Sequence, residues 1–133
     1  MKIADYFSGI ERSLRGIKGA KISGQIMSLA SDDYNGLLRC RVLFWDESYL
    51  DLYEVVSTEL GYPVKVHYSY TYMMGGKQRF RYDNAPHHPE IRTHPHHKHI
   101  GDRSKLSASE EPKLAHVLDE IQNVLAEKQA SKS

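Results

Sequence analysis

The sequence predicts an α+β fold in which about five antiparallel strands form one sheet, covered by an N-terminal and a C-terminal helix. Three observations support this class. An amphipathic helical pattern occupies each end of the chain, alternating strand patterns lie between them, and turn residues join consecutive strands closely. The chain has 133 residues, which suits a single domain over residues 1–133.

A short helix is expected over residues 1–15. Ile3, Phe7 and Leu14 recur at helical spacing, which places them on one face. Gly16 follows this pattern and marks the end of the helix.

An antiparallel sheet is expected over residues 22–83. Apolar and polar residues alternate there in short runs, and residues that favour turns bound these runs. The expected strands cover residues 25–30, 37–45, 49–57, 64–74 and 77–83. Asn35-Gly36 and Gly75-Gly76 are typical of hairpin turns.

The fourth expected strand carries a tyrosine stripe. One of its faces is formed by Val64, Val66, Tyr68, Tyr70 and Tyr72. Such a stripe predicts the half-buried face of a sheet, and stacking on nucleic-acid bases is the alternative. Lys65 is expected on the opposite face. Cys40 and Trp45, in the second expected strand, are predicted to lie in the core.

Residues 84–109 are expected to form a histidine-rich loop before the last helix. No periodicity survives there, and three prolines disfavour both helix and central strand. A second helix is expected over residues 110–128, where apolar residues form a helical stripe. Residues 129–133 are expected to fray.

The composition limits the classes of function. Eighteen Lys and Arg residues against 17 Asp and Glu residues give a net charge of +1, which argues against a strongly basic nucleic-acid binder. Cys40 is the single cysteine, so an intramolecular disulfide and a cysteine-based zinc site are excluded. No apolar run approaches the ~20 residues of a membrane span. The N-terminus lacks the apolar segment of a secretory signal, so a cytoplasmic protein is expected.

The expected loop concentrates one residue type. Six of the eight histidines lie between His87 and His99. Imidazole transfers protons near neutral pH, and its neutral nitrogen binds transition metals. Because loops on a rigid sheet often carry functional sites, we expect the site here.

The first hypothesis is metal-independent cleavage of RNA, which needs no cofactor. One imidazole removes the proton of the 2′-hydroxyl, another protonates the leaving oxygen, and a cation stabilises the phosphorane. His97 and His99 are expected to exchange protons, and Asp83 to orient an imidazole. The wider set of catalytic candidates adds His87, His88 and His96. Arg81 and Lys98 are expected to neutralise the phosphate, and the other substrate-binding candidates are Arg79, Tyr82 and Arg92.

The second hypothesis is a metal-dependent nuclease or hydrolase. Zinc or manganese would activate water, held by His94, His96, His97 and His99, with His87, His88 or Asp83 as further candidate ligands. The spacing of these residues matches no closed zinc module. A third hypothesis is a non-catalytic module that binds RNA or protein, which agrees with the balanced net charge.

The run HYSYTYMMGGKQRFRYDNAPHHPEI, followed by HPHHKHIGD, resembles the TumE-type toxins of prokaryotic toxin–antitoxin pairs. The resembling stretch runs from about His67 to Asp102, and His94 stands where the family pattern has an aromatic residue. The resemblance implies a helix-turn-helix antitoxin that binds and silences this protein. It covers the positions Arg81, Tyr82, Asp83, Asn84, His87, His88, His96, His97, Lys98 and His99. RNA cleavage follows by analogy with small toxins as a class. An edge strand also makes a homodimer a candidate assembly.

Overall fold

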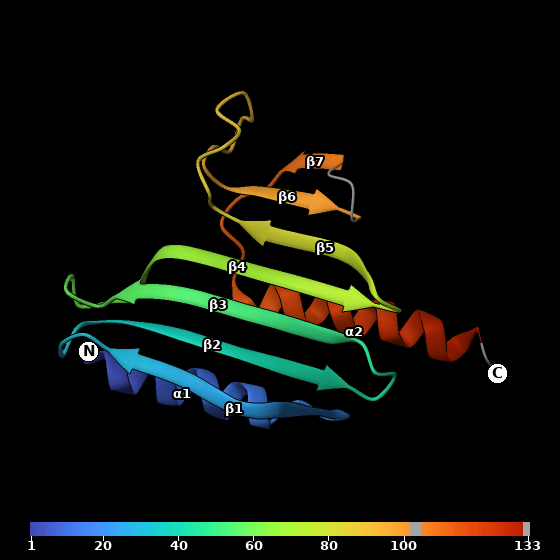
Figure 1. Cartoon of the computed structure of the whole chain (residues 1–133), viewed down its shortest axis with the longest axis horizontal. Helices are drawn as coiled ribbons and strands as arrows, with labels where there is room; N and C mark the ends of the chain where they lie inside the picture. The colour runs from blue at the N-terminus through green and yellow to red at the C-terminus, as the bar shows by residue number, and fades with distance from the viewer. Residues whose placement is uncertain (102–104, 132–133) are drawn as a thin grey trace.

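The computed structural model of the chain describes residues 1–101 and 105–131. Within these ranges, seven antiparallel strands form one sheet in sequential order (Figure 1). The strands are β1 (Ala20–Ala30), β2 (Asn35–Phe44), β3 (Tyr49–Ser57), β4 (Val64–Met74), β5 (Lys77–Asp83), β6 (His97–Ile100) and β7 (Lys105–Ala108). The helices are α1 (Ile3–Arg15) and α2 (Leu114–Ala130). Each strand pairs with the next one along the chain, and the connection between β5 and β6 is the long segment of residues 84–96.

The α+β class, with one antiparallel sheet and an N-terminal and a C-terminal helix, is confirmed, but within residues 1–101 and 105–131 the sheet has seven strands rather than the expected five or so. β6 and β7 lie inside the segment 84–109 that was expected to be a loop. Each has only four residues, too few for a period-two pattern to stand out in a polar sequence. β6 is held by pairing with β5, which brings Asp83 opposite His97. The sequence distance between these partners hides the pairing from local patterns.

The expected boundaries of the helices and the tail also shift. α2 begins at Leu114 rather than at residue 110, and it runs to Ala130. Residues 129 and 130, expected to fray, are therefore helical, and residues 132 and 133 lie outside the described residues. Asp102, the last residue of the stretch that resembles the toxins, also lies outside them. No helix among the described residues is long and apolar enough to cross a membrane.

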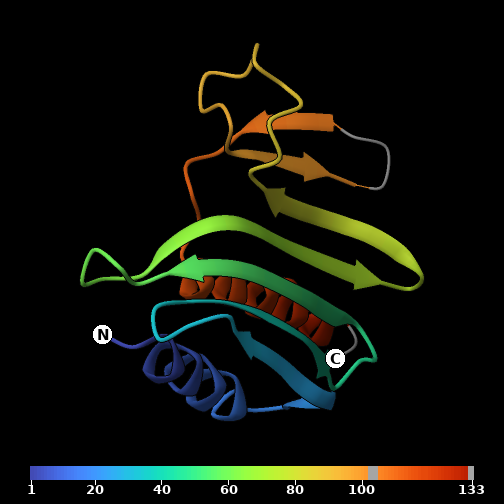
Figure 2. The ribbon, with the colours of Figure 1, turned by 60° about the vertical axis from the view of Figure 1, so that its left-hand side comes forward.

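Both helices pack on the same face of the sheet (Figures 1 and 2). Ile3 and Phe7 of α1 and Val117 and Ile121 of α2 belong to one core cluster with the sheet. β3 shows the alternation that this arrangement requires, because every second residue from Leu50 is buried. The other face carries no helix among the described residues, and we call it the open face.

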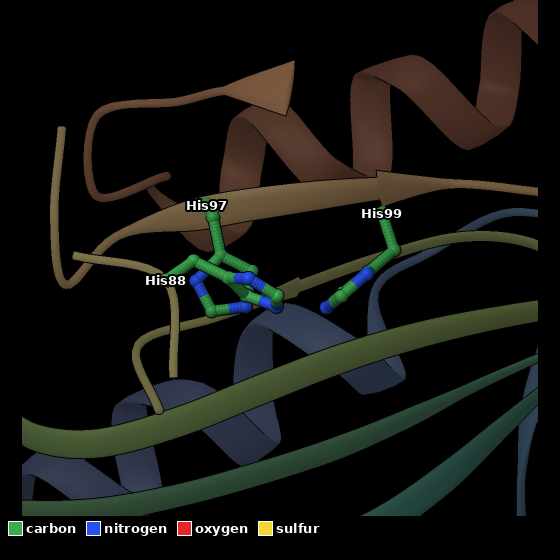
Figure 3. A group of neighbouring side chains, drawn as sticks. All are labelled: His88, His97 and His99. Carbon is green, nitrogen blue, oxygen red and sulfur yellow. The ribbon is translucent and has the colours of Figure 1, made fainter. Parts of the chain in front are cut away.

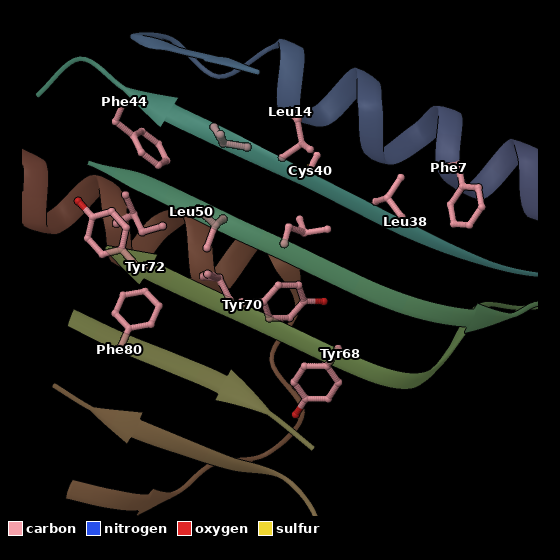
Figure 4. Close-up of a cluster of buried hydrophobic side chains, with 14 of the residues drawn as sticks. Phe7, Leu14, Leu38, Cys40, Phe44, Leu50, Tyr68, Tyr70, Tyr72 and Phe80 are labelled. Carbon is pink, nitrogen blue, oxygen red and sulfur yellow. The ribbon is translucent and has the colours of Figure 1, made fainter. Parts of the chain in front are cut away.

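The tyrosine stripe lies in the core (Figure 4). Tyr68, Tyr70 and Tyr72 are at most 3% exposed, so sheet burial is confirmed and these rings are not available for base stacking. Cys40 is buried as expected. Trp45 is 47% exposed, so its expected place in the core is wrong. It follows the last residue of β2, where the chain turns towards β3.

A buried polar network links four parts of the fold. Glu54 of β3 accepts hydrogen bonds from the hydroxyls of Tyr6 and Tyr70. Lys65 donates to Tyr70 and to the carbonyl of Pro112, which precedes α2. Lys65 was expected on the opposite face, but the β3–β4 register shifts between His67 and Lys65, and this bulge turns Lys65 inward. Burial lowers the pKa of the Lys65 ammonium.

Candidate functional site

The pairing of β5 with β6 assembles a cluster of charged and titratable side chains on the open face. Asp83 lies opposite His97, and Arg81 lies opposite His99. Alternate residues of a strand share a face, so all four side chains lie on one side of the sheet. The segment between the two strands folds back, and its His88 lies against His97 and His99 (Figure 3). We call Asp83, His88, His97 and His99 the histidine cluster.

His97 is bound at both of its ring nitrogens. Its Nδ1 lies 2.9 Å from the carbonyl oxygen of Pro95, and its Nε2 lies 2.8 Å from Oδ1 of Asp83. A carbonyl oxygen only accepts hydrogen bonds, so Nδ1 carries a proton. The contact between Nε2 and Oδ1 of Asp83 is a second hydrogen bond, with one proton between the two atoms. His97 is 2% exposed, so it is shielded from solvent and from a substrate.

Asp83 is the centre of the cluster. Arg81 donates through Nε to Oδ2 at 3.0 Å, and the backbone N–H of Ala85 donates to Oδ1 at 3.0 Å. Nε2 of His99 lies 3.6 Å from Oδ2, just beyond hydrogen-bond distance. These donors hold the carboxyl group of Asp83 in place. The buried carboxylate therefore fixes His97 on one side and Arg81 on the other.

His99 has a different environment from His97. Burial lowers the pKa of its imidazole from the usual 6.5, and the nearby His97, His88 and Arg81 act in the same direction against the carboxylate of Asp83. The ring of His99 meets that of His97 edge-on, with ring centres 4.8 Å apart. A lowered pKa leaves His99 neutral at pH 7, which is the form that accepts a proton.

His88 is the third imidazole of the cluster and comes from the segment between β5 and β6. Its Nδ1 lies 3.3 Å from Oε1 of Glu90. His88, His97 and His99 each offer a nitrogen, and these nitrogens lie within 4.8 Å of one another. The arrangement could serve two purposes. It could exchange protons with a bound phosphodiester, or it could hold a divalent metal ion.

The remaining candidate histidines lie apart from the cluster. His96 stacks on Tyr68, and its Nδ1 lies 2.9 Å from the hydroxyl of that tyrosine. Nδ1 of His94 lies 3.2 Å from the backbone carbonyl of His88, and His87 is exposed. Of the expected metal ligands His94, His96, His97 and His99, only the last two join the nitrogens that converge.

The substrate-binding candidates are also divided by the alternation of the strands. Lys98 and Tyr82 both bind Glu120 of α2, so they lie on the helix-covered face and fasten α2 to the sheet. Arg92 is exposed, 3.8 Å from Glu110. Arg79 is exposed on β5. Arg81 is therefore the one cation of that candidate set that bonds to the cluster in the described part of the chain.

Two residues outside the expected catalytic and binding sets hold the segment in place. The Thr93 hydroxyl donates to the carbonyl of His96 and accepts from the backbone N–H of Ser109. The Asn84 side chain bonds to backbone groups of Tyr68 and Val66 on β4. Asn84 belonged to the resembling stretch, whereas Thr93 carried no local signal.

This fold and cluster define a small α+β protein with a polar site on the open face of an antiparallel sheet. The family model of toxin TumE matches residues 20–129, a range that includes the whole sheet and most of α2. The chain therefore belongs to the TumE toxin family, which confirms the resemblance seen in the sequence. Membership of a toxin family implies an antitoxin partner. No curated protein and no solved structure matches the chain.

Proposed function

We propose that this toxin cleaves RNA by acid–base chemistry at the histidine cluster. The observation that carries the proposal is the placement of Asp83 between His97 and Arg81, with His99 and His88 beside them. A neutral imidazole, a second imidazole that can carry a proton, and a guanidinium are the groups that transesterification of RNA requires.

The proposed reaction uses the 2′-hydroxyl of the substrate as the nucleophile. His99 accepts the hydroxyl proton, and the 2′ oxygen attacks the adjacent phosphorus. The bond from phosphorus to the 5′ oxygen breaks, and His88 donates its proton to that oxygen. The products are a 2′,3′-cyclic phosphate and a 5′-hydroxyl. Exchange with solvent then returns both imidazoles to their starting forms.

Two further residues support this step. Arg81 uses Nε to bind Asp83, and the remaining N–H groups of its guanidinium are suited to the phosphate. His97 is buried and held at both nitrogens, so we assign it a positioning role rather than proton exchange with substrate. Its ring orients Asp83 through the bond from Nε2.

Cleavage of an unstructured RNA by purified toxin, free of antitoxin, tests the proposal. The wild type should cleave in the presence of excess chelator. His99→Ala should reduce the rate by at least about 100-fold, as expected for loss of a general base. His116→Ala is the matched control, because His116 is exposed on α2. Full activity of His99→Ala would contradict the proposal.

A second candidate function is metal-dependent hydrolysis. The convergence of His88, His97 and His99 favours it, because a ligating histidine commonly donates its other N–H to a carbonyl, as Nδ1 of His97 does. Zinc or manganese held there would activate water. Stoichiometric metal in the purified toxin, with activity lost to chelator, would establish this function. Toxicity without RNA cleavage would instead indicate the non-catalytic binding module.

We further propose a helix-turn-helix protein as the antitoxin. RNA as substrate leads us to expect that the toxin acts in the cytoplasm. β1 is an edge strand of the sheet, so a homodimer formed through it is a further candidate. Size-exclusion chromatography with light scattering, on the toxin alone and on its complex, tests both assemblies.

A further inference from the structure

We propose that the open face of the sheet, from β2 to β5, binds a single-stranded segment of RNA and leads it to the histidine cluster. The inference rests on the proposed function for RNA as the substrate class, and it states where the RNA lies on the protein. The groove that it concerns is defined by Arg39, Arg41, Tyr49, Asp51, Tyr53 and Arg81, which we call the open-face groove.

The strand register connects this groove to the histidine cluster. One row of paired residues crosses the sheet through Arg39, Tyr53, Ser69, Asp83 and His97. The next row crosses it through Arg41, Asp51, Thr71, Arg81 and His99. Neighbouring strands lie about 4.8 Å apart, so the arginines of β2 and the histidines of β6 are separated by about 19 Å. A strand of several nucleotides would cover this path.

The open face is hollowed along these rows. The cavity has a volume of about 850 Å³ and extends from β1 to Arg81 on β5. Arg81 lines the cavity and also binds Asp83 of the histidine cluster. The groove and the cluster are therefore continuous, and a phosphate at Arg81 would lie between them.

The groove holds the side chains that bind single-stranded nucleic acid. The guanidinium of Arg39 lies over the ring of Tyr53, 4.9 Å from its centre, and that of Arg41 lies 3.9 Å from the ring centre of Tyr49. Arg41 is held further by two bonds to Asp51, at 2.7 and 3.0 Å. The guanidinium groups suit phosphates, and the aromatic rings suit unstacked bases.

The charge of the groove also fits a polyanion. Its lining contains three arginines and one aspartate, and Asp83 beside it binds Arg81, so the arginines outnumber the nearby carboxylates. Arginines in excess are expected at a local nucleic-acid site. Stacking on the half-buried rings of Tyr49 and Tyr53 would need bases that are not paired in a duplex, which favours a single strand.

Binding of a fluorescein-labelled, unstructured 12-nucleotide RNA tests the inference. All proteins carry His99→Ala, so that the RNA stays intact. Replacing both Arg39 and Arg41 by Gln should weaken binding at least tenfold, and Tyr53→Ala should weaken it about tenfold. The matched control replaces Arg12 and Arg15 of α1 by Gln, with the same loss of charge on exposed residues of the helix. This control should bind within twofold of its parent. Thermal unfolding confirms that each variant is folded.

A length series with the active toxin separates this inference from the proposed function. The Arg39→Gln, Arg41→Gln double variant should lower kcat/KM for the 12-nucleotide RNA about tenfold and leave that for a dinucleotide unchanged. If the groove variants bind and cleave RNA as well as the control variant does, the inference is overturned, but the proposed RNA cleavage stands. If the groove variants bind RNA more weakly but the wild type does not cleave it, the proposed function is overturned and the inference stands. The inference would also be overturned if the protein bound duplex RNA as tightly as single-stranded RNA. The same holds if the groove variants lost binding to the antitoxin but kept their binding to RNA.

Discussion

At the scale of single residues, the two histidines of β6 differ although only one residue separates them. His97 is buried and bound at both nitrogens, whereas His99 lies at the side of Asp83 with a lowered pKa. The sequence predicted both residues and Asp83 as parts of a site. It could not separate their roles, because the difference arises from the carbonyl of Pro95 and from burial by the returning segment.

The pH dependence of cleavage follows from the environment of His99. Burial and the positive charge of Arg81 lower the pKa of His99, so the base is deprotonated at neutral pH. The ascending limb of kcat/KM against pH should have its midpoint below 6.5. Arg81→Gln removes one cause of the lowering, so the limb should move to higher pH while the rate falls. A midpoint above 6.5 in the wild type would contradict this assignment of the base.

The histidines of the segment between β5 and β6 show what the local sequence could not predict. His88, His94 and His96 lie within one short segment, yet only His88 joins the cluster. Their placement depends on tertiary contacts, such as the stacking of His96 on Tyr68. Tyr82 could have been excluded, because alternation along the expected strand β5 places it on the face opposite Asp83. Lys98 could not, because β6 left no local pattern in the sequence.

At the scale of elements, the contact between α1 and the first hairpin depends on a glycine. A Cβ at Gly36 would lie 2.7 Å from the carbonyl oxygen of Leu29 and 3.0 Å from the ring of Phe7. Gly36→Ala should therefore lower the free energy of unfolding by about 1–3 kcal/mol through overpacking. Gly9→Ala in α1, whose Cβ would have no neighbour closer than 3.9 Å, should raise it by about 0.5–1 kcal/mol. Urea unfolding measures both, and equal stability of the two variants would refute this packing account.

The attachment of α2 to the turn after β2 should depend on pH. Burial acts to raise the pKa of Asp46, but hydrogen bonds from Ser48 and Lys128 outweigh it and lower the pKa below 3.8. A lowered pKa contributes stability that is present above pH 3.8 and is lost as the pH falls through the folded-state value. Asp46→Asn should cost about 2 kcal/mol at pH 7. The deficit should shrink on acidification below pH 3.8, and a deficit independent of pH would show that charge is not its cause.

Elements with long patterns were predictable, whereas short ones were not. The first five strands and both helices follow from alternation, helical stripes and turn residues, although their ends shift. β6 and β7 depend on hydrogen bonds to a preformed edge at β5. The bulge that turns Lys65 inward also lacks a local signal, because its reason is the distant hydroxyl of Tyr70 and the carbonyl of Pro112.

At the scale of the whole molecule, the network around Glu54 joins α1, the sheet and the approach to α2. Glu54→Gln removes a charge beside Lys65 and leaves one tyrosine hydroxyl without its carboxylate acceptor. The free energy of unfolding should fall by about 3 kcal/mol. Glu127→Gln, on the exposed surface of α2, is the control and should leave stability unchanged. Equal urea midpoints for the two variants would contradict a stabilising role for the network.

The two faces of the sheet carry different groups of residues. The helix-covered face contains the core and the α2 contacts of Lys98 and Tyr82. The open face carries the histidine cluster and the open-face groove. Substitutions on the open face at Arg39, Arg41 and Tyr53 are therefore expected to change RNA binding with little effect on folding.

The chemistry of the product ends tests whether the histidine cluster cleaves RNA through the 2′-hydroxyl. Mass spectrometry of fragments made by the wild-type toxin in excess chelator should show 2′,3′-cyclic phosphate and 5′-hydroxyl ends. A substrate with a single 2′-deoxy nucleotide at the cleaved position should resist cleavage. Fragments with 3′-hydroxyl and 5′-phosphate ends, formed only when metal is present, would contradict the account and assign the three histidines to a metal centre.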